Sequence, residues 1–152
     1  MHEVRRWGRP MVVWGAVGRH ESQIVVGSDN QRGGKLAAER FLALGRRRPV
    51  FLGDDAHGEF AERLLGFRHA LAAHGIEPLT PTVANFTVSA GAQAVHALLD
   101  RHPQFDAVFA ASDLLAIGAI RALIERGRRV PEDVSVIGYD DTPLGATYLP
   151  PL

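Results

Sequence analysis

The sequence contains no cysteine, and this absence removes several kinds of chemistry at once. Disulfide frameworks, thiolate catalysis and zinc or iron–sulfur sites held by cysteine are all excluded. An excess of one charge is also missing, because 17 basic side chains are balanced by 17 acidic ones. A neutral chain has no overall positive field to attract nucleic acid or an anionic membrane. We therefore expect any DNA-binding role to come from a different segment.

Long apolar runs are missing as well. No uninterrupted apolar stretch approaches the roughly 20 residues that a membrane-spanning helix needs. The first seven residues have the charge of a signal-peptide start, but Gly8, Arg9 and Pro10 interrupt the apolar run that follows. We therefore expect a cytoplasmic protein that is not exported and does not contact a membrane.

The order of apolar and polar stretches predicts an α/β fold. From Val25 onward, short apolar runs alternate with longer stretches of helical period, which is typical of parallel strands joined by helices. At 152 residues and 46% hydrophobic content, the chain is long enough for one compact domain. The predicted strands are Val12–Trp14, Ile24–Val26, Val50–Leu52, Val83–Phe86, Ala107–Ala110 and Val134–Ile137.

Four helices are predicted between and after these strands. Asp29 and Ser112 are expected to cap the first and the fourth, because short polar side chains accept hydrogen bonds from free N–H groups of the first turn. Glycines that favour left-handed backbone are expected to end three helices, at Gly45, Gly75 and Gly127. The second helix carries Phe60 to Leu71 and the third runs from about Ser89 to Asp100.

The expected architecture is a doubly wound parallel sheet with about four strands in its main lobe. The two strands before Gly27 are expected to belong to a different lobe. Near the end of the chain, Pro143, Pro150 and Pro151 interrupt the pattern and predict a crossover or linker.

Candidate binding residues follow the predicted strands. Open parallel sheets bind ligands outside the carboxyl ends of their strands, so polar and aromatic side chains there are the ones to examine. Each candidate also has an ordinary structural role open to it, as a helix cap, a solvated side chain, a core ring or a turn residue. The candidates are His57, Glu59, Arg63, Phe86, Ser112, Asp113 and Asp140.

The sequence lacks the common motifs for catalysis. Gly33-Gly34-Lys35 resembles part of a P-loop, but Asp29 replaces its first glycine and Leu36 replaces its Ser or Thr. Neither a G-x-S-x-G nor an H-E-x-x-H motif occurs. We therefore predict no catalytic residue and no cofactor.

A metal site is the less favoured interpretation of one acidic loop. The side chains of Asp54, Asp55, His57 and Glu59 are of types that ligate metals, but a flexible acidic loop has the same composition. We predict no metal.

Several motifs resemble those of LacI/GalR transcriptional regulators, in the order and at the spacing of that family. The strongest is Arg129 to Asp141, which is similar to R-V-P-x-D-V-S-V-I-G-F/Y-D-D. The others are Val26 to Ala37 with its D-N-x-x-G-G run, Leu44 to Arg48, Glu62 to Phe67, Phe109 to Ala119, and Leu149 to Leu152. Together they cover nearly the whole chain from Pro10 onward.

The resemblance implies two Rossmann-like lobes, like those of periplasmic sugar-binding proteins. The effector would lie in the cleft between them, and a helix-turn-helix headpiece would precede them. On this basis residues 1–27 are the remnant of the first lobe, 28–149 form the second lobe, and 150–152 begin the crossover back. The headpiece and most of the first lobe are then absent from this sequence.

The resemblance also implies roles for the candidate residues. Arg63, Phe86, Ser112 and Asp140 match positions that line the family's cleft, and Asp113 lies beside them. His57 and Glu59 match a loop that contacts effector in some members. Two departures bear on which ligand is bound: Gly15 stands where several members have an acidic contact, and Ser112 where many have asparagine.

The expected function is therefore sensing of a sugar-like or nucleoside-like effector within a regulator. Such a protein would be a homodimer when intact and would reach DNA only through its headpiece. A solute-binding protein of a sugar transporter is the alternative, and a small α/β enzyme is a third hypothesis. We also expect the surface around Val12, Val13 and Ile24–Val26 to be uncovered and to promote self-association.

Overall fold

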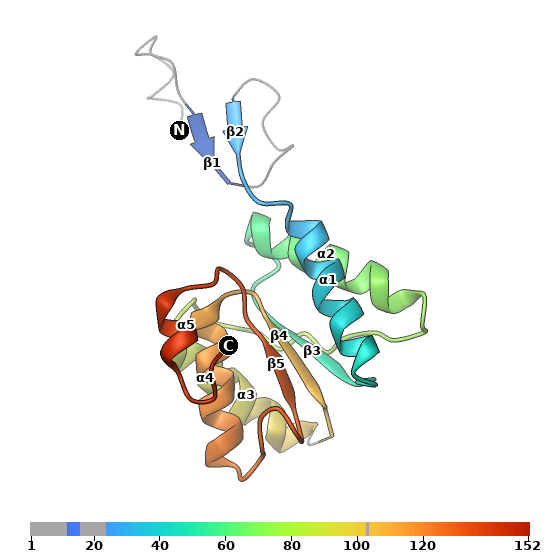
Figure 1. Cartoon of the computed structure of the whole chain (residues 1–152), viewed down its shortest axis with the longest axis vertical. Helices are drawn as coiled ribbons and strands as arrows, with labels where there is room; N and C mark the ends of the chain where they lie inside the picture. The colour runs from blue at the N-terminus through green and yellow to red at the C-terminus, as the bar shows by residue number, and fades with distance from the viewer. Residues whose placement is uncertain (1–11, 16–23, 103) are drawn as a thin grey trace.

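A computed structural model describes residues 12–15, 24–102 and 104–152 of the chain (Figure 1). Its strands are β1 (Val12–Trp14), β2 (Ile24–Val26), β3 (Pro49–Leu52), β4 (Ala107–Ala110) and β5 (Ser135–Ile137). Its helices are α1 (Asn30–Ala43), α2 (Gly58–Ala72), α3 (Val88–Arg101), α4 (Asp113–Glu125) and α5 (Pro143–Thr147). The α/β class predicted from the sequence is confirmed.

The main sheet is parallel and has the order β3-β4-β5. Helices α1 and α2 pack on each other on one side of it, and α3 and α4 on the other (Figure 1). Every residue of β3 and β4 is buried, as expected for parallel strands covered on both faces. The core between sheet and helices is rich in phenylalanine rings that pack in edge-on and tilted pairs, namely Phe41, Phe51, Phe67 and Phe109.

The predicted fourth strand, Val83–Phe86, is wrong. Those residues form no strand, and the edge of the sheet is extended instead by a single bridge between Val50 and Leu79. The Phe51 N–H donates to the Leu79 carbonyl at 2.8 Å. Prolines on either side of Leu79, at 78 and 81, have no N–H to donate, so the ladder cannot continue. Val83 is apolar because its side chain is buried in the core, not because it is in a strand.

The helix ends follow the predicted chemistry. Asp29 accepts from the Arg32 N–H, and Ser112 from the Leu115 N–H, so both caps are confirmed. Gly45, Gly75 and Gly127 have φ of 74°, 68° and 72°, the left-handed backbone expected of glycine after a helix.

The tail differs from its prediction. Pro143 does not interrupt regular structure but occupies the first turn of the short helix α5, a position where a missing N–H costs nothing. Thr142 caps this helix by accepting from the Gly145 N–H.

Strands β1 and β2 form a separate two-stranded parallel sheet. Its large apolar side chains are uncovered: Val12 is 61% exposed, Trp14 72% and Ile24 67%. A single chain segment leads from β2 into α1 and the main sheet (Figure 1). This arrangement agrees with the expectation that the two strands lie apart from the main lobe, while the domain boundaries themselves stay a prediction.

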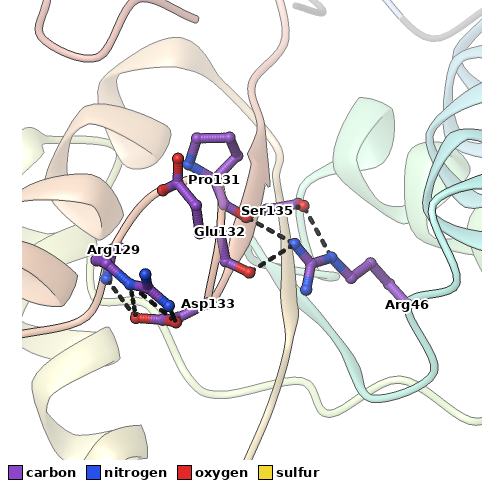
Figure 2. Close-up of polar contacts among 6 residues, drawn as sticks. All are labelled: Arg46, Arg129, Pro131, Glu132, Asp133 and Ser135. Carbon is purple, nitrogen blue, oxygen red and sulfur yellow. Dashed lines mark hydrogen bonds and ion pairs between the residues drawn. The ribbon is translucent and has the colours of Figure 1, made fainter.

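The loops at the amino ends of the main strands are fixed by arginines (Figure 2). Arg46 comes from the segment before β3 and donates to Ser135 Oγ at 3.0 Å and to the carbonyls of Pro131 and Glu132. Arg129 pairs with Asp133 at 2.6 Å, and these hydrogen bonds lower the pKa of Asp133 to about 2. The loop before β5 is therefore held from both sides. Among the described residues, no helix is long and apolar enough to cross a membrane.

Helices α1 and α2 approach so closely that only glycine fits at their contact. A Cβ on Gly66 would lie 1.9 Å from the Gln31 carbonyl oxygen, and one on Gly34 would contact the Arg63 carbonyl equally closely. Both obstacles are backbone atoms of the facing helix. The two glycines thereby set the distance between the amino-terminal half of α1 and the middle of α2.

We predict that Gly66→Ala destabilises the fold by about 3 kcal/mol, because the helices must separate to admit the methyl group. The matched control is Gly45→Ala, where a Cβ meets nothing within 4 Å and only the positive φ is strained. That control should cost about 1 kcal/mol. Urea unfolding monitored by circular dichroism measures the free energy of unfolding of both variants. If the two lost equal stability, the close approach of α1 and α2 would not be what excludes a side chain at residue 66.

We further predict that the isolated chain self-associates through β1 and β2, since contiguous exposed apolar surface favours association. Sedimentation velocity should show a concentration-dependent increase in mass. Replacing Trp14 and Ile24 together by Ser should reduce it, whereas Leu65→Ser, an exposed apolar position on α2, should not. A wild-type chain that stays monomeric at high concentration would contradict this.

Candidate functional site

Arg63 is the centre of the candidate site, and it is only 4% exposed. It lies on α2 and its guanidinium points to the carboxyl end of β4, where Nη1 donates to the Ala111 carbonyl. Its Nε donates to Asn30 Oδ1 at 2.8 Å, from the first turn of α1. The guanidinium carbon also lies 3.6 Å from the centre of the Tyr139 ring and 5.2 Å from that of Phe60. Three other elements therefore hold one side chain, together with Phe60 of its own helix.

Glycine again makes this arrangement possible. A Cβ on Gly33 would lie 2.6 Å from Cε2 of Tyr139 and 2.8 Å from its hydroxyl. Because Gly33 has no side chain, the tyrosine ring fits between α1 and Arg63. The paired glycines that resemble a P-loop in the sequence thus have a packing role: Gly33 admits Tyr139, and Gly34 admits the backbone of Arg63.

Some of the hydrogen-bonding capacity of Arg63 is unused. A guanidinium has five N–H donors, of which Asn30 and Ala111 accept two. Among the described residues, no atom accepts from Nη2. A buried donor without a partner costs about 1–3 kcal/mol, so such a group calls for an acceptor from elsewhere.

Asp140 follows β5 and lies near Arg63 without pairing to it. Its φ of 102° is a left-handed conformation that few residues other than glycine adopt. Burial raises the pKa of Asp140; Arg63 opposes this rise, and the charges of Asp113 and Glu59 add to it. Within the described part of the chain, no salt bridge joins Asp140 to Arg63. The backbone of Asp140 is therefore strained. Burial and the neighbouring carboxylates also disfavour the ionised form of its side chain.

Ser112 and Asp113 follow β4, at the start of α4. Ser112 caps α4 with its Oγ and is 8% exposed. Asp113 Oδ2 accepts from the Thr142 N–H at 2.7 Å and from its hydroxyl at 2.8 Å, while the Asp113 N–H donates to the Tyr139 carbonyl. Asp113 therefore holds the loop after β5 in place, which in turn fixes Tyr139 and Asp140.

An aromatic cluster borders the site on the side of α2. The rings of His57, Phe60 and Phe86 lie 4.7–5.2 Å apart, and Phe86 is 37% exposed. His57 precedes α2 without capping it by its side chain. Glu59, in the first turn of α2, is close enough to Asp140 to raise its pKa.

The structure thus brings all seven predicted residues to the carboxyl ends of β3, β4 and β5. Two of them, Asp113 and Asp140, line a pocket of about 400 Å³ together with the loop after β5 and Leu152. In the residues that can be described, no three His, Asp or Glu side chains gather closely enough to hold a metal ion. The binding roles of the seven residues stay predictions.

Sequence reasoning missed two residues at this site. Asn30 is 1% exposed and contacts Arg63 directly, yet it was read only as part of the D-N motif. Tyr139 lies within the Arg129 to Asp141 motif but is not among the predicted site residues, although its ring covers one face of the guanidinium. The available signal was that both stand next to selected motif positions, at the start of α1 and beside Asp140.

Comparison with known proteins finds relatives over most of the chain. A family described as "Periplasmic binding protein-like domain" matches residues 38–152. The curated HTH-type transcriptional regulator CelR of Thermobifida fusca is 43% identical over 149 residues, which are 95% of this chain and 42% of that protein. The chain thus spans less than half the length of this relative.

Two solved structures share the fold and part of the sequence. One is described as a transcriptional regulator CelR–cellobiose complex; it has a TM-score of 0.84 and 42% identity, and the match covers 95% of this chain and 46% of that one. The other is a LacI family transcriptional regulator from Enterococcus faecium with bound ribose. Its TM-score is 0.87 at 31% identity, over 99% of this chain and 57% of that one.

We predict that Asp140→Asn makes the folded chain more stable at neutral pH. A carboxyl whose pKa is raised on folding destabilises the folded state when ionised, and this penalty disappears as the pH falls through the raised pKa. Asparagine tolerates the positive φ and carries no charge. Urea midpoints of the variant and the wild type should differ at pH 7 and converge as the pH falls below the ordinary aspartate pKa of about 3.9. A variant that is less stable at pH 7 would show that the carboxylate is favourably placed.

Proposed function

Because this chain belongs to the family of periplasmic binding protein-like domains, we propose that it is the effector-sensing part of a LacI-type transcriptional regulator. The effector would be a small polyhydroxylated molecule, either a sugar or a nucleoside-like compound. The observation that carries the proposal is the buried Arg63, whose Nη2 has no acceptor among the described residues.

The groups around Arg63 suit hydroxyl groups better than an anion. A hydroxyl oxygen accepts from the guanidinium and its hydrogen donates to the carboxylate of Asp140, so one ligand group satisfies both. Ser112 adds a hydroxyl that donates or accepts. Phe86, partly exposed at the border, offers a ring against which the apolar face of a sugar packs. The carboxylates of Asp140 and Glu59 disfavour a negatively charged ligand.

The named relatives support this choice over the alternatives. One structure holds cellobiose and another ribose, and both proteins are described as transcriptional regulators. We therefore favour a regulator over a solute-binding protein of a transporter. We also favour binding over catalysis, because no named relative is an enzyme.

The assembly of the whole regulator is part of the proposal. Residues 28–149 would form one lobe of the effector cleft, residues 1–27 would belong to the other, and residues 150–152 would start the crossover between them. DNA would be bound by a headpiece, in a homodimer, in the cytoplasm. A ligand that contacts both lobes would favour one arrangement of them, and the headpieces would report that shift to the operator.

We predict that cellobiose or ribose raises the thermal midpoint of the chain, because a ligand that binds only the folded state stabilises it by RT ln(1 + [L]/Kd). Arg63→Ala should abolish the shift, and Asp140→Asn should weaken binding about tenfold while leaving the fold intact. Binding should also weaken as the pH falls, because Asp140 accepts hydrogen bonds best when ionised and its pKa is raised.

The matched control is Arg68→Ala on the same helix. Arg68 pairs with Glu77 at 2.8 Å on the exposed side of the protein, so its loss should leave the shift unchanged. Isothermal titration calorimetry provides the Kd values. If neither sugar, nor any of a panel of pentoses, hexoses and nucleosides, moves the midpoint of the wild type, sensing of such ligands by this chain is excluded.

A further inference from the structure

The first turn of α1 contains a residue whose contacts suggest a role of its own. Asn30 is 1% exposed, more deeply buried than Arg63. Its Oδ1 accepts from Arg63 Nε at 2.8 Å, and its Nδ2 donates to the Ser28 carbonyl at 3.2 Å and to Glu62 Oε2 at 3.3 Å. Both ends of the amide are thus used.

These contacts fix the direction in which Arg63 presents its free donors. A guanidinium is planar and rigid, so acceptors for Nε and Nη1 together determine where Nη2 points. The Ala111 carbonyl fixes Nη1, and Asn30 fixes Nε. The Tyr139 ring prevents tilting on one face. Of the two acceptors only Asn30 Oδ1 belongs to a side chain, and it is therefore the one that substitution can remove.

The amide of Asn30 is itself held in one orientation. Its Nδ2 faces two acceptors, the Ser28 carbonyl and the Glu62 carboxylate, so the oxygen must face Arg63. The close α1–α2 contact at Gly34 and Gly66 brings Asn30 within reach of α2. An asparagine at this place is thus oriented before any ligand arrives.

We propose that Asn30 is the positioning residue of the effector site, which aims the free edge of Arg63 at the ligand without touching the ligand itself. This inference rests on the proposed function for the identity of the ligand. The aiming of Arg63 is a property of the free protein and is measured without ligand.

The test measures the Arg63 Nε–H signal in a two-dimensional ¹H–¹⁵N NMR spectrum of the full chain, assigned as the peak missing from Arg63→Lys. In the wild type this proton should exchange slowly with water. Asn30→Ala should accelerate its exchange by about tenfold or more, because the acceptor is gone. The same variant should weaken cellobiose or ribose binding about tenfold.

A rescue pair separates positioning from general stability. Asn30→Asp combined with Glu62→Gln keeps an acceptor for Arg63 Nε and reverses the hydrogen bond to residue 62, while the hydrogen bond to the Ser28 carbonyl is lost. It should restore slow Nε exchange and bring the Kd back to within about threefold of the wild type. If Asn30→Ala does not fold, the double variant tests the proposal by itself. Fast exchange of the Arg63 Nε proton in the folded double variant would then overturn the proposal.

The outcomes also distinguish the two proposals. Unchanged Nε exchange in folded Asn30→Ala overturns the positioning role even when the wild type binds sugar. If the wild type binds no sugar but Asn30→Ala frees the Nε proton, the aiming of Arg63 stands and the sugar-sensing function falls. Urea unfolding of each variant verifies that the folded state is being compared.

Discussion

The architecture of the site depends on one buried cation. Removing a guanidinium from water is costly unless its donors and its charge find partners, and Arg63 is given an amide oxygen, a carbonyl and an aromatic face. Those partners come from α1, from the end of β4 and from the loop after β5. The helices, the strand ends and the loop must therefore meet at one point for Arg63 to be buried at all. Among the described residues, Nη2 of this cation has no acceptor.

The glycines show what this meeting requires of the sequence. Gly34 and Gly66 let two helix backbones approach at the level of Arg63, and Gly33 leaves room for Tyr139. None of these positions has a positive φ, so the need is for space and not for an unusual backbone conformation. The G-G of one motif and the G-F of another are thus two halves of a single packing contact. Their spacing in the sequence reflects the geometry of α1 on α2.

Sequence reasoning succeeded where local chemistry decides the structure. Caps at Asp29 and Ser112 and the glycine ends of three helices follow from interactions within a few residues, and all are confirmed. It failed at Val83–Phe86, where a buried side chain outside any strand gave the apolar pattern of one. It also missed Asn30, because the partner that makes this residue important is 33 positions away. The shared edge of the sheet was predictable from topology, but the contacts made across it were not.

In the described part of the chain, polar groups are paired at one end of the main sheet and some are left unpaired at the other, and this contrast indicates where a ligand binds. At the amino ends of the strands, polar groups satisfy one another: Arg46 ties two loops together, and Arg129 holds Asp133 so firmly that its pKa falls to about 2 (Figure 2). At the carboxyl ends, no described residue accepts from Arg63 Nη2, and Asp140 combines a left-handed backbone with a pKa raised by burial. A direct ion pair between Asp140 and Arg63 would have lowered the pKa of Asp140 and used free donors of Arg63. Selection for stability alone favours the first kind of arrangement, so the second is most simply explained by a ligand that completes it.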